Sequence, residues 1–165
     1  MTEKQLIQKA EEIVSALKEQ NLTLGLAESC TGGWLSKIIT EVSGVSAIYN
    51  GGICSYSNEI KIKLLGVKPE TLRLYGAVSE QTATEMANGA RKALNADIGV
   101  GITGIAGPNS DDTLKPVGLI YVAVADEKKT IVKELRNNFT DEIRLNNRLS
   151  AVETAITILG GLNEK

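Results

Sequence analysis

Helical and strand-like patterns alternate along the whole chain, and this alternation constrains the fold more than any other feature. Apolar residues at helical spacing predict a helix at each end of the chain and further helices between the strands. The strand-like apolar runs lie at 22–26, 48–56, 98–102, 117–125 and 130–139. The last two runs flank four polar residues, which predicts an antiparallel hairpin. We therefore expect an α/β fold, a three-layer α/β/α sandwich around a mixed sheet.

No internal repeat, low-complexity tract or linker interrupts the chain, so we expect a single domain over residues 1–165. Thr2, with Gln5 three residues later, has the pattern of a capping box at the start of the first helix. Asp141 is expected to open the last helix, and the pair 160–161, both glycine, to end it.

The absence of histidine limits the chemistry that the chain can perform. It excludes a Ser-His-Asp triad, a Cys-His pair and an HExxH zinc site. The two cysteines, Cys30 and Cys54, are too few for a four-thiolate metal site within one chain. We expect no metal ion and no cofactor, so lysine, tyrosine, carboxylates, hydroxyls or thiols must carry any acid–base or nucleophilic step.

Charge and hydropathy indicate where the protein acts. The net charge of −2 does not favour nucleic acid or an anionic membrane as a partner. Residues 1–14 are charged and amphipathic, unlike a secretory signal, and the longest apolar run, 117–125, is too short to span a bilayer. We expect a cytoplasmic protein whose cysteines are thiols, with Cys54 buried in a strand.

The segment 28–33, Glu-Ser-Cys-Thr-Gly-Gly, joins a predicted strand to a predicted helix. Ser29 at the end of the strand would lie beside backbone N–H groups suited to a phosphate or an oxyanion. Glu28 could orient a lysine, face a cationic substrate or interact with the helix dipole. An ordinary capped helix start, with glycines for tight packing, explains the same residues equally well.

An activated serine needs a base, and without histidine the best candidate is a lysine whose pKa is lowered by burial. Lys61 follows a strand end and begins a short helix, although solvated lysines are common at such positions. Ser57, four residues before Lys61, is a rival nucleophile. Cys30 is intrinsically more nucleophilic, but neighbours in an extended chain point to opposite sides, so Cys30 and Ser29 are not expected to share a pocket face.

Two glycine-rich segments remain. Residues 99–104 satisfy G-x-G-x-x-G, the dinucleotide-binding fingerprint, but a loop with Gly107-Pro108 follows instead of a helix. The fingerprint is therefore interpreted as a chance match. The long loop from Gly104 to Gly118 contains small residues that permit close approach to a ligand, and a loop of this length is typical of a functional segment.

Five motifs in this order, AESCTGG, YSNEIK, GAVSE, GIAGP and KPVG, resemble the CinA carboxy-terminal domain family over nearly the whole chain. The resemblance implies a three-layer α/β/α domain that forms homodimers or larger homo-oligomers. It also implies hydrolysis of the carboxamide of nicotinamide mononucleotide to nicotinate mononucleotide and ammonia, by a Ser–Lys dyad without metal. The alternative is a catalytically weak paralogue that acts as a nucleotide-binding or competence- and damage-linked interaction module.

The resemblance places the dyad on Ser29 and Lys61, with Tyr56 as a possible aid in protonating the leaving ammonia. The expected substrate-binding residues are Glu28, Cys30, Thr31, Gly32, Gly33, Thr103, Gly104, Ala106, Gly107 and Arg144. This chain departs from the family after GIAGP, where Asn-Ser-Asp-Asp replaces a glycine cluster at 109–112. It departs again at F-x-G-D-R, where the glycine is missing and Arg144 lies one position late. The added carboxylates would repel a phosphate unless they point away.

Overall fold

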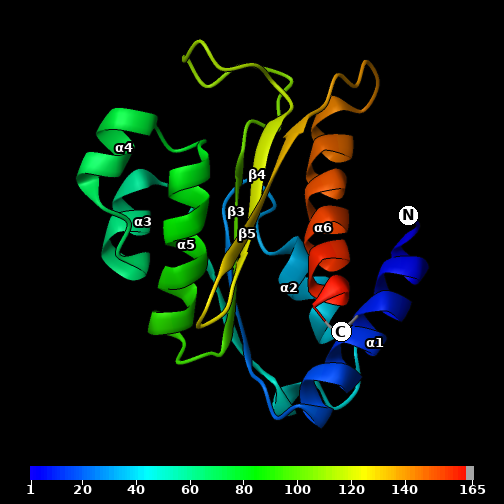
Figure 1. Cartoon of the computed structure of the whole chain (residues 1–165). Coiled ribbons are helices and arrows are strands. Elements are labelled where there is room, and N and C mark those ends of the chain that lie inside the picture. The colour runs from blue at the N-terminus through cyan, green and yellow to red at the C-terminus, as the bar shows by residue number, and fades with distance from the viewer. Residues whose placement is uncertain (163–165) are drawn as a thin grey trace.

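The computed structural model describes residues 1–162, in which five strands form one mixed sheet (Figure 1). The strands are β1 (Leu24–Glu28), β2 (Tyr49–Cys54), β3 (Ile98–Gly104), β4 (Leu119–Ala125) and β5 (Thr130–Arg136). Their order is β2-β1-β3-β4-β5, with β1 parallel to both neighbours. The last three strands are antiparallel, which confirms the predicted hairpin.

Helices cover both faces of the sheet, and this arrangement confirms the predicted α/β/α sandwich (Figure 1). One layer contains α1 (Glu3–Glu19), α2 (Trp34–Thr40) and α6 (Ile143–Gly161). The opposite layer contains α3 (Asn58–Leu65), α4 (Pro69–Tyr75) and α5 (Glu80–Ala93), and a short 3₁₀ helix, Val45–Ala47, precedes β2. Across residues 1–162, none of the helices has the length and apolar character needed to cross a bilayer.

The two faces of the sheet are packed differently. Large aliphatic side chains fill the space between the sheet and the layer of α1, α2 and α6, whereas small residues dominate the contact with α5. A Cβ atom at Gly99 would lie 2.0 Å from the Ala87 carbonyl oxygen, and one at Gly101 would lie 2.4 Å from that of Ala83. These glycines let α5 approach β3, and β3 continues into a loop and the antiparallel β4, which confirms that the G-x-G-x-x-G match is not a dinucleotide fingerprint.

Several local predictions are confirmed and others are corrected. The Thr2–Gln5 capping box forms as expected. The prediction that Cys54 is buried was wrong, because β2 is an edge strand with alternating exposure and Cys54 falls on its exposed side. The last helix begins after Glu142, not at Asp141, and it continues through the glycines 160–161 that were expected to end it. Packing of its preceding turns on the core holds this last turn in helical form.

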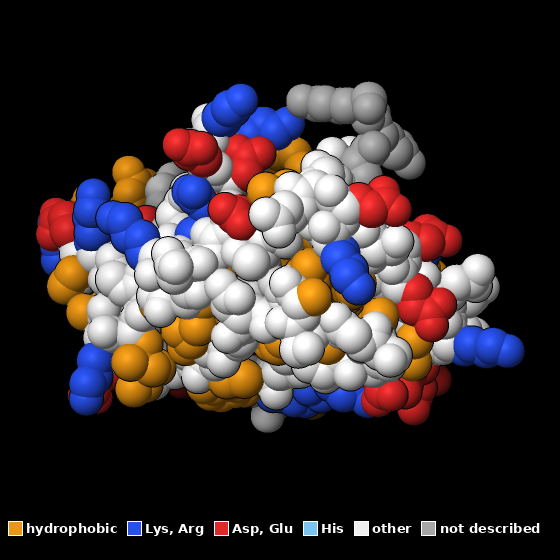
Figure 2. Space-filling view, turned by 90° about the horizontal axis from the view of Figure 1, so that it is seen from below, with side chains coloured by type: hydrophobic (Ala, Val, Ile, Leu, Met, Phe, Trp, Pro, Cys, Tyr) orange, Lys and Arg blue, Asp and Glu red, His pale blue; other side chains and the backbone are white. Residues whose placement is uncertain are grey.

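Charged side chains of both signs are interspersed on the end of the molecule that lies at the bottom of Figure 1, as Figure 2 shows. No large field of one sign covers this face, in keeping with the net charge of −2.

Candidate active site

The three parallel strands end at one edge of the sheet, and their carboxyl ends bring the candidate catalytic residues together. Ser29 directly follows β1, the 55–56 segment follows β2, and Thr103 lies near the end of β3. Lys61 lies in the first turns of α3, the helix that follows β2 in the sequence. Its Nζ lies 3.0 Å from the Oγ of Ser29, although the two residues are 32 positions apart. Ligand sites of α/β sheets lie at this edge because the connecting loops leave there.

Lys61 is almost completely buried, with 1% of its surface exposed. Burial lowers the pKa of its amine from 10.5 to about 8, because desolvation penalises the charged form. The amine lies 2.6 Å from the Ser55 carbonyl oxygen and 3.4 Å from that of Tyr56. A neutral amine has two N–H donors and one lone pair. When these carbonyls accept the two N–H groups, the lone pair remains to accept the proton of the Ser29 hydroxyl.

A pocket of about 210 Å³ opens above this pair. Eight of the residues predicted for the site line it, and so do Ala77, Val78 and Asp111. Ala77 and Val78 had not been predicted as ligand contacts, whereas Asp111 is one of the loop carboxylates expected to repel a phosphate. The eight are Ser29, Cys30, Tyr56, Lys61, Thr103, Gly104, Ala106 and Arg144. Ala77 and Val78 belong to the GAVSE motif, so the motif itself was the signal that could have identified them.

The remaining predicted residues, Glu28, Thr31, Gly32, Gly33 and Gly107, do not line this pocket. Glu28 is buried, and its carboxylate accepts hydrogen bonds from the backbone N–H groups of Leu35 and Ser36 and from the Ser36 hydroxyl, at 2.8–3.0 Å. This carboxylate therefore caps α2 from the preceding strand, and it faces the helix rather than the pocket. Of the interpretations that the sequence left open for Glu28, the structure supports the interaction with the helix N-terminus.

Replacing Glu28 by alanine is expected to lower the free energy of unfolding by about 3 kcal/mol, because three hydrogen bonds to a buried carboxylate are lost. Chemical denaturation measures this change. Glu41→Gln is the matched control, because Glu41 lies exposed at the other end of α2, and it should change stability by less than about 0.5 kcal/mol. An unchanged stability of the Glu28→Ala variant, with a raised KM, would show instead that this carboxylate contacts the substrate.

The loop after Ser29 follows the predicted geometry only in part. Ser29 and Cys30 both line the pocket, but Cys30 also belongs to the buried core that packs against α2 and α6, whereas the Ser29 hydroxyl meets Lys61 of α3. The N–H of Gly32 donates to the Ser29 carbonyl, while no backbone carbonyl among residues 1–162 accepts the N–H groups of Cys30, Thr31 and Gly33. The Cys30 N–H interacts with the thiol of its own residue. The backbone N–H groups of this loop are therefore candidates for binding an oxyanion.

The alternative nucleophiles are poorly placed. Burial is the main reason that the pKa of the Cys30 thiol is raised to about 11, so the thiolate is scarce at neutral pH. Ser57 is the N-cap of α3, and its Oγ accepts the N–H of Ile60 at 3.2 Å. Ser29 is thus the hydroxyl that the structure sets beside a buried amine.

Tyr56 and Arg144 form the outer wall of the pocket. The Tyr56 side chain is 64% exposed, and its hydroxyl accepts a hydrogen bond from Nη2 of Arg144 at 3.0 Å. Nη1 of Arg144 donates to the Gly107 carbonyl at 2.9 Å. Within residues 1–162, the Tyr56 hydroxyl has no hydrogen bond to Ser29 or Lys61. The Gly107 carbonyl therefore affects the pocket indirectly, by holding the Arg144 side chain in place.

Arg148, one helical turn beyond Arg144, was not identified from the sequence. Its Nε donates to the Cys30 carbonyl at 3.0 Å and its Nη2 to the Thr31 carbonyl at 2.9 Å. The only sequence signal was its spacing of four residues from Arg144, which places both side chains on one face of α6.

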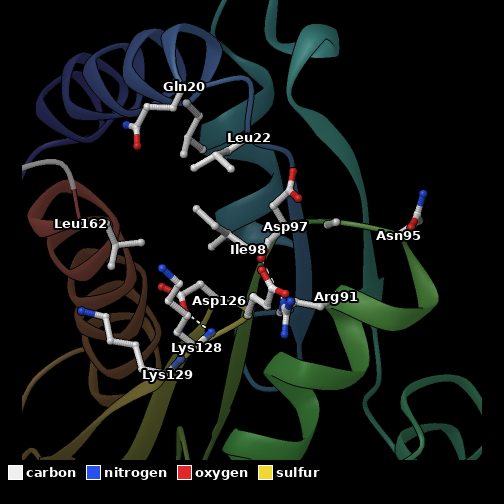
Figure 3. Close-up of a pocket in the computed structure, with 13 residues that line it drawn as sticks. Gln20, Leu22, Arg91, Asn95, Asp97, Ile98, Asp126, Lys128, Lys129 and Leu162 are labelled. Carbon is white, nitrogen blue, oxygen red and sulfur yellow. Dashed lines mark hydrogen bonds between the residues drawn. The ribbon is translucent and has the colours of Figure 1, made fainter.

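A larger hollow of about 750 Å³ lies at the opposite end of the sheet and is bordered by Leu22, Ile98 and charged side chains (Figure 3). Asp126 accepts two backbone N–H groups of its own turn, and Nε of Arg91 donates to the Asp97 carbonyl at 3.0 Å. This hollow contains none of the predicted site residues, and its volume alone does not indicate chemistry. Over residues 1–162, no three His, Cys, Asp or Glu side chains gather in a way that could hold a metal ion.

The mixed sheet, with a serine and a buried lysine together at the carboxyl ends of its parallel strands, defines an α/β protein with a candidate site for nucleophilic catalysis. The model of the CinA C-terminal domain matches residues 6–162, and the chain belongs to this family.

The similarity extends to curated and solved relatives. The nicotinamide-nucleotide amidohydrolase PncC of Escherichia coli is 49% identical over 125 residues, which are 76% of this chain and 76% of that protein. A CinA-like protein of Kosmotoga olearia is 52% identical over 75% of this chain but only 30% of its own length, so the chain spans about a third of such longer relatives. The crystal structure of the competence/damage inducible protein CihA from Agrobacterium tumefaciens superposes with a TM-score of 0.90 at 38% identity, over 99% of this chain and 97% of that one.

Proposed function

We propose that this protein hydrolyses the carboxamide of nicotinamide mononucleotide to nicotinate mononucleotide and ammonia. The observation that carries the proposal is the buried Lys61 amine, 3.0 Å from the Ser29 hydroxyl, with two backbone carbonyls placed to accept its N–H groups. The similarity to the nicotinamide-nucleotide amidohydrolase of E. coli supports the choice of substrate. The pocket above Ser29 can admit a carboxamide at the end of β1.

The reaction proceeds in two acyl-transfer steps. Neutral Lys61 accepts the Ser29 hydroxyl proton while Ser29 Oγ bonds to the carboxamide carbon, giving a tetrahedral oxyanion. The Lys61 ammonium then protonates the amide nitrogen, the C–N bond breaks, and ammonia leaves an acyl-serine. Water attacks the acyl carbon with Lys61 accepting its proton, and this proton returns to Ser29 Oγ as nicotinate mononucleotide is released. The Tyr56 hydroxyl accepts from Arg144, so its own O–H remains available as a donor to the departing ammonia.

The backbone supplies the oxyanion donors. No backbone carbonyl in the described part of the chain accepts the N–H groups of Cys30 and Thr31, and both residues follow directly after the nucleophile. Each such donor contributes about 3–4 kcal/mol to the transition state. Thr103, Gly104 and Ala106 line the pocket on the side of β3, and we propose that this side contacts the nucleotide. The Thr103 hydroxyl donates to the Ala77 carbonyl at 2.7 Å, which leaves its lone pairs as acceptors. Arg144 brings a positive charge for the phosphate.

The test is ammonia release from nicotinamide mononucleotide at neutral pH without added metal, with nicotinate mononucleotide identified by chromatography. Nicotinamide, which lacks the ribose and phosphate, is the comparison substrate and should react far more slowly. A folded wild-type protein that binds the nucleotide without releasing ammonia would refute the amidase proposal. That result would favour a nucleotide-binding or competence-linked interaction module.

The rate should depend on pH through Lys61. This amine must be neutral to accept the serine proton, and burial lowers its pKa to about 8. We expect kcat/KM to be low below this pH, to rise as Lys61 deprotonates, and to level off above it. Lys63→Gln, on the same helix but outside the pocket, should leave the midpoint unchanged. A profile that falls with rising pH would mean that the protonated amine is the active form.

Asp111 is the acidic residue of the pocket wall, and the sequence predicted that a carboxylate in this loop would oppose a phosphate. Asp111→Asn keeps an oxygen for the N–H of Thr113, which now donates to Oδ1 at 3.1 Å. We expect KM for nicotinamide mononucleotide to fall by about threefold as the repulsion is removed. Asp112→Asn is the control, because Asp112 does not line the pocket and its φ of 64° suits asparagine. Equal effects of both changes, or a raised KM, would contradict this prediction.

We further propose that the chain works in the cytoplasm as a homodimer or larger homo-oligomer, without a nucleic-acid or membrane partner. The resemblance to the CinA family implies self-association, and the net charge of −2 does not favour polyanionic partners. Analytical ultracentrifugation of the full chain measures the oligomeric state, and a monomer at micromolar concentration would contradict the proposed assembly.

A further inference from the structure

The Arg148 side chain bridges α6 and the loop that carries the nucleophile. Its guanidinium donates to two consecutive carbonyls, those of Cys30 and Thr31, at 3.0 and 2.9 Å. The guanidinium also lies over the ring of Trp34, 5.3 Å from the ring centroid. None of the carboxylates in the described part of the chain lies within ion-pair distance of Arg148. Its charge is therefore directed at the backbone of this loop.

These contacts determine the direction of one N–H group. In a trans peptide the N–H points opposite to the C=O of the same unit. The Cys30 carbonyl points toward Arg148 on α6, so the N–H of Thr31 points away from α6. Lys61 and α3 lie on the other face of the sheet (Figure 1). The Thr31 N–H is therefore turned toward the side on which Ser29 and Lys61 meet.

We propose that Arg148 is a positioning residue, which holds the peptide between Cys30 and Thr31 so that its N–H binds the oxyanion formed on Ser29. This inference rests on the proposed hydrolysis, and it adds a residue that does not line the pocket. The fork of the guanidinium matches two adjacent carbonyls, which a lysine cannot do. The positive charge at the carbonyl also polarises the peptide and strengthens its N–H as a donor.

The substitution Arg148→Met tests the role. We expect kcat for nicotinamide mononucleotide to fall about 100-fold, as for the loss of an oxyanion donor, with KM unchanged within about threefold. Arg148→Lys keeps the charge but can reach only one of the two carbonyls, so its kcat should be about tenfold higher than that of Arg148→Met. Arg136→Met is the matched control, because Arg136 is exposed and pairs with Glu134 far from the loop, and its kcat should equal that of the wild type.

A second readout does not depend on the substrate. A fluorophosphonate probe labels an activated serine: the Ser29 Oγ–P bond forms, the P–F bond breaks, fluoride leaves, and Lys61 takes the proton. The phosphonyl oxygen then occupies the oxyanion position. We expect Arg148→Met to slow labelling about 100-fold, measured by intact mass, with the pH midpoint still near that of the wild type. The midpoint reports Lys61, so a structural collapse of the dyad would shift it.

The outcomes separate the two proposals. Arg148→Met labelled at the wild-type rate, or slowed with a shifted pH midpoint, would overturn the positioning role. Wild-type protein that is labelled at Ser29 but releases no ammonia would refute the proposed substrate, while the labelling rates would still decide the role of Arg148. Wild-type protein that is neither labelled nor active would overturn both.

Discussion

The Lys61→Met variant is expected to lose nicotinamide mononucleotide hydrolysis by at least about a thousandfold, because it lacks the amine proposed to accept the Ser29 proton. The Lys61 Nζ, 3.0 Å from Ser29 Oγ, is the atom proposed to accept the proton. Methionine fills a similar volume but has no basic atom. Steady-state ammonia release measures the loss. Lys63→Met on the same helix should keep wild-type kcat. Activity of the Lys61→Met variant within tenfold of wild type would exclude Lys61 as the base.

The same variant should be more stable than the wild type at neutral pH. The pKa of Lys61 is about 8 in the folded protein, below its ordinary 10.5, so the unfolded chain binds the proton more tightly. The burial cost, about 3 kcal/mol, is present in full below pH 8 and disappears as pH rises toward 10.5. The variant also loses the hydrogen bonds that the Lys61 amine donates to the carbonyls of Ser55 and Tyr56, which offsets part of this stabilisation. We expect the free energy of unfolding to increase by about 1–2 kcal/mol at pH 7.

Denaturant unfolding at several pH values measures this linkage. The comparison of Lys61 with Met is made in a Cys30→Ala background, because the Cys30 thiol and the Lys61 amine influence each other's pKa. We expect the difference in stability between the two proteins to shrink steadily between pH 8 and 10.5. A difference that is constant over that range would show that the Lys61 amine keeps its ordinary pKa in the folded protein.

The Ser29→Ala variant is expected to lose hydrolysis to the same degree while it still binds nicotinamide mononucleotide. Removal of one hydroxyl eliminates the nucleophile, and the other residues that line the pocket are unchanged. Calorimetry should give a dissociation constant within about threefold of the wild-type KM, provided that chemistry is slow relative to dissociation. A Ser29→Ala protein with substantial turnover would mean that another residue attacks the carboxamide.

Two nearby residues give matched controls for this prediction. Ser57→Ala should keep kcat and lower stability by about 1 kcal/mol, because Ser57 caps α3. Cys30→Ala should also keep kcat, since the raised pKa of the thiol makes it inert and the proposed role of Cys30 lies in its backbone N–H. Loss of activity in either control would show that these side chains take part directly.

Much of the architecture was predictable because it follows from local patterns. Apolar spacing identified most helices and strands, and the polar residues 126–129 marked the hairpin between β4 and β5. Element ends were less predictable: the start of α6 moved to Ile143 because Glu142, with φ of 41°, is its N-cap. Burial of Cys54 was mispredicted because strand order decides which strand is an edge, and no local pattern encodes that order.

The sequence by itself determined which chemistries are open to this protein. The absence of histidine made a lysine the best candidate for a base, and the motifs around Ser29 and Lys61 predicted which two residues form the dyad. Only the tertiary structure decided the surroundings of these two residues: Glu28 caps α2, no backbone carbonyl among residues 1–162 accepts the N–H of Thr31, and Arg148 reaches the carbonyls of Cys30 and Thr31 from α6. The sequence specifies the type of each residue. The direction of a backbone N–H and the partner of a buried carboxylate depend on contacts between distant segments.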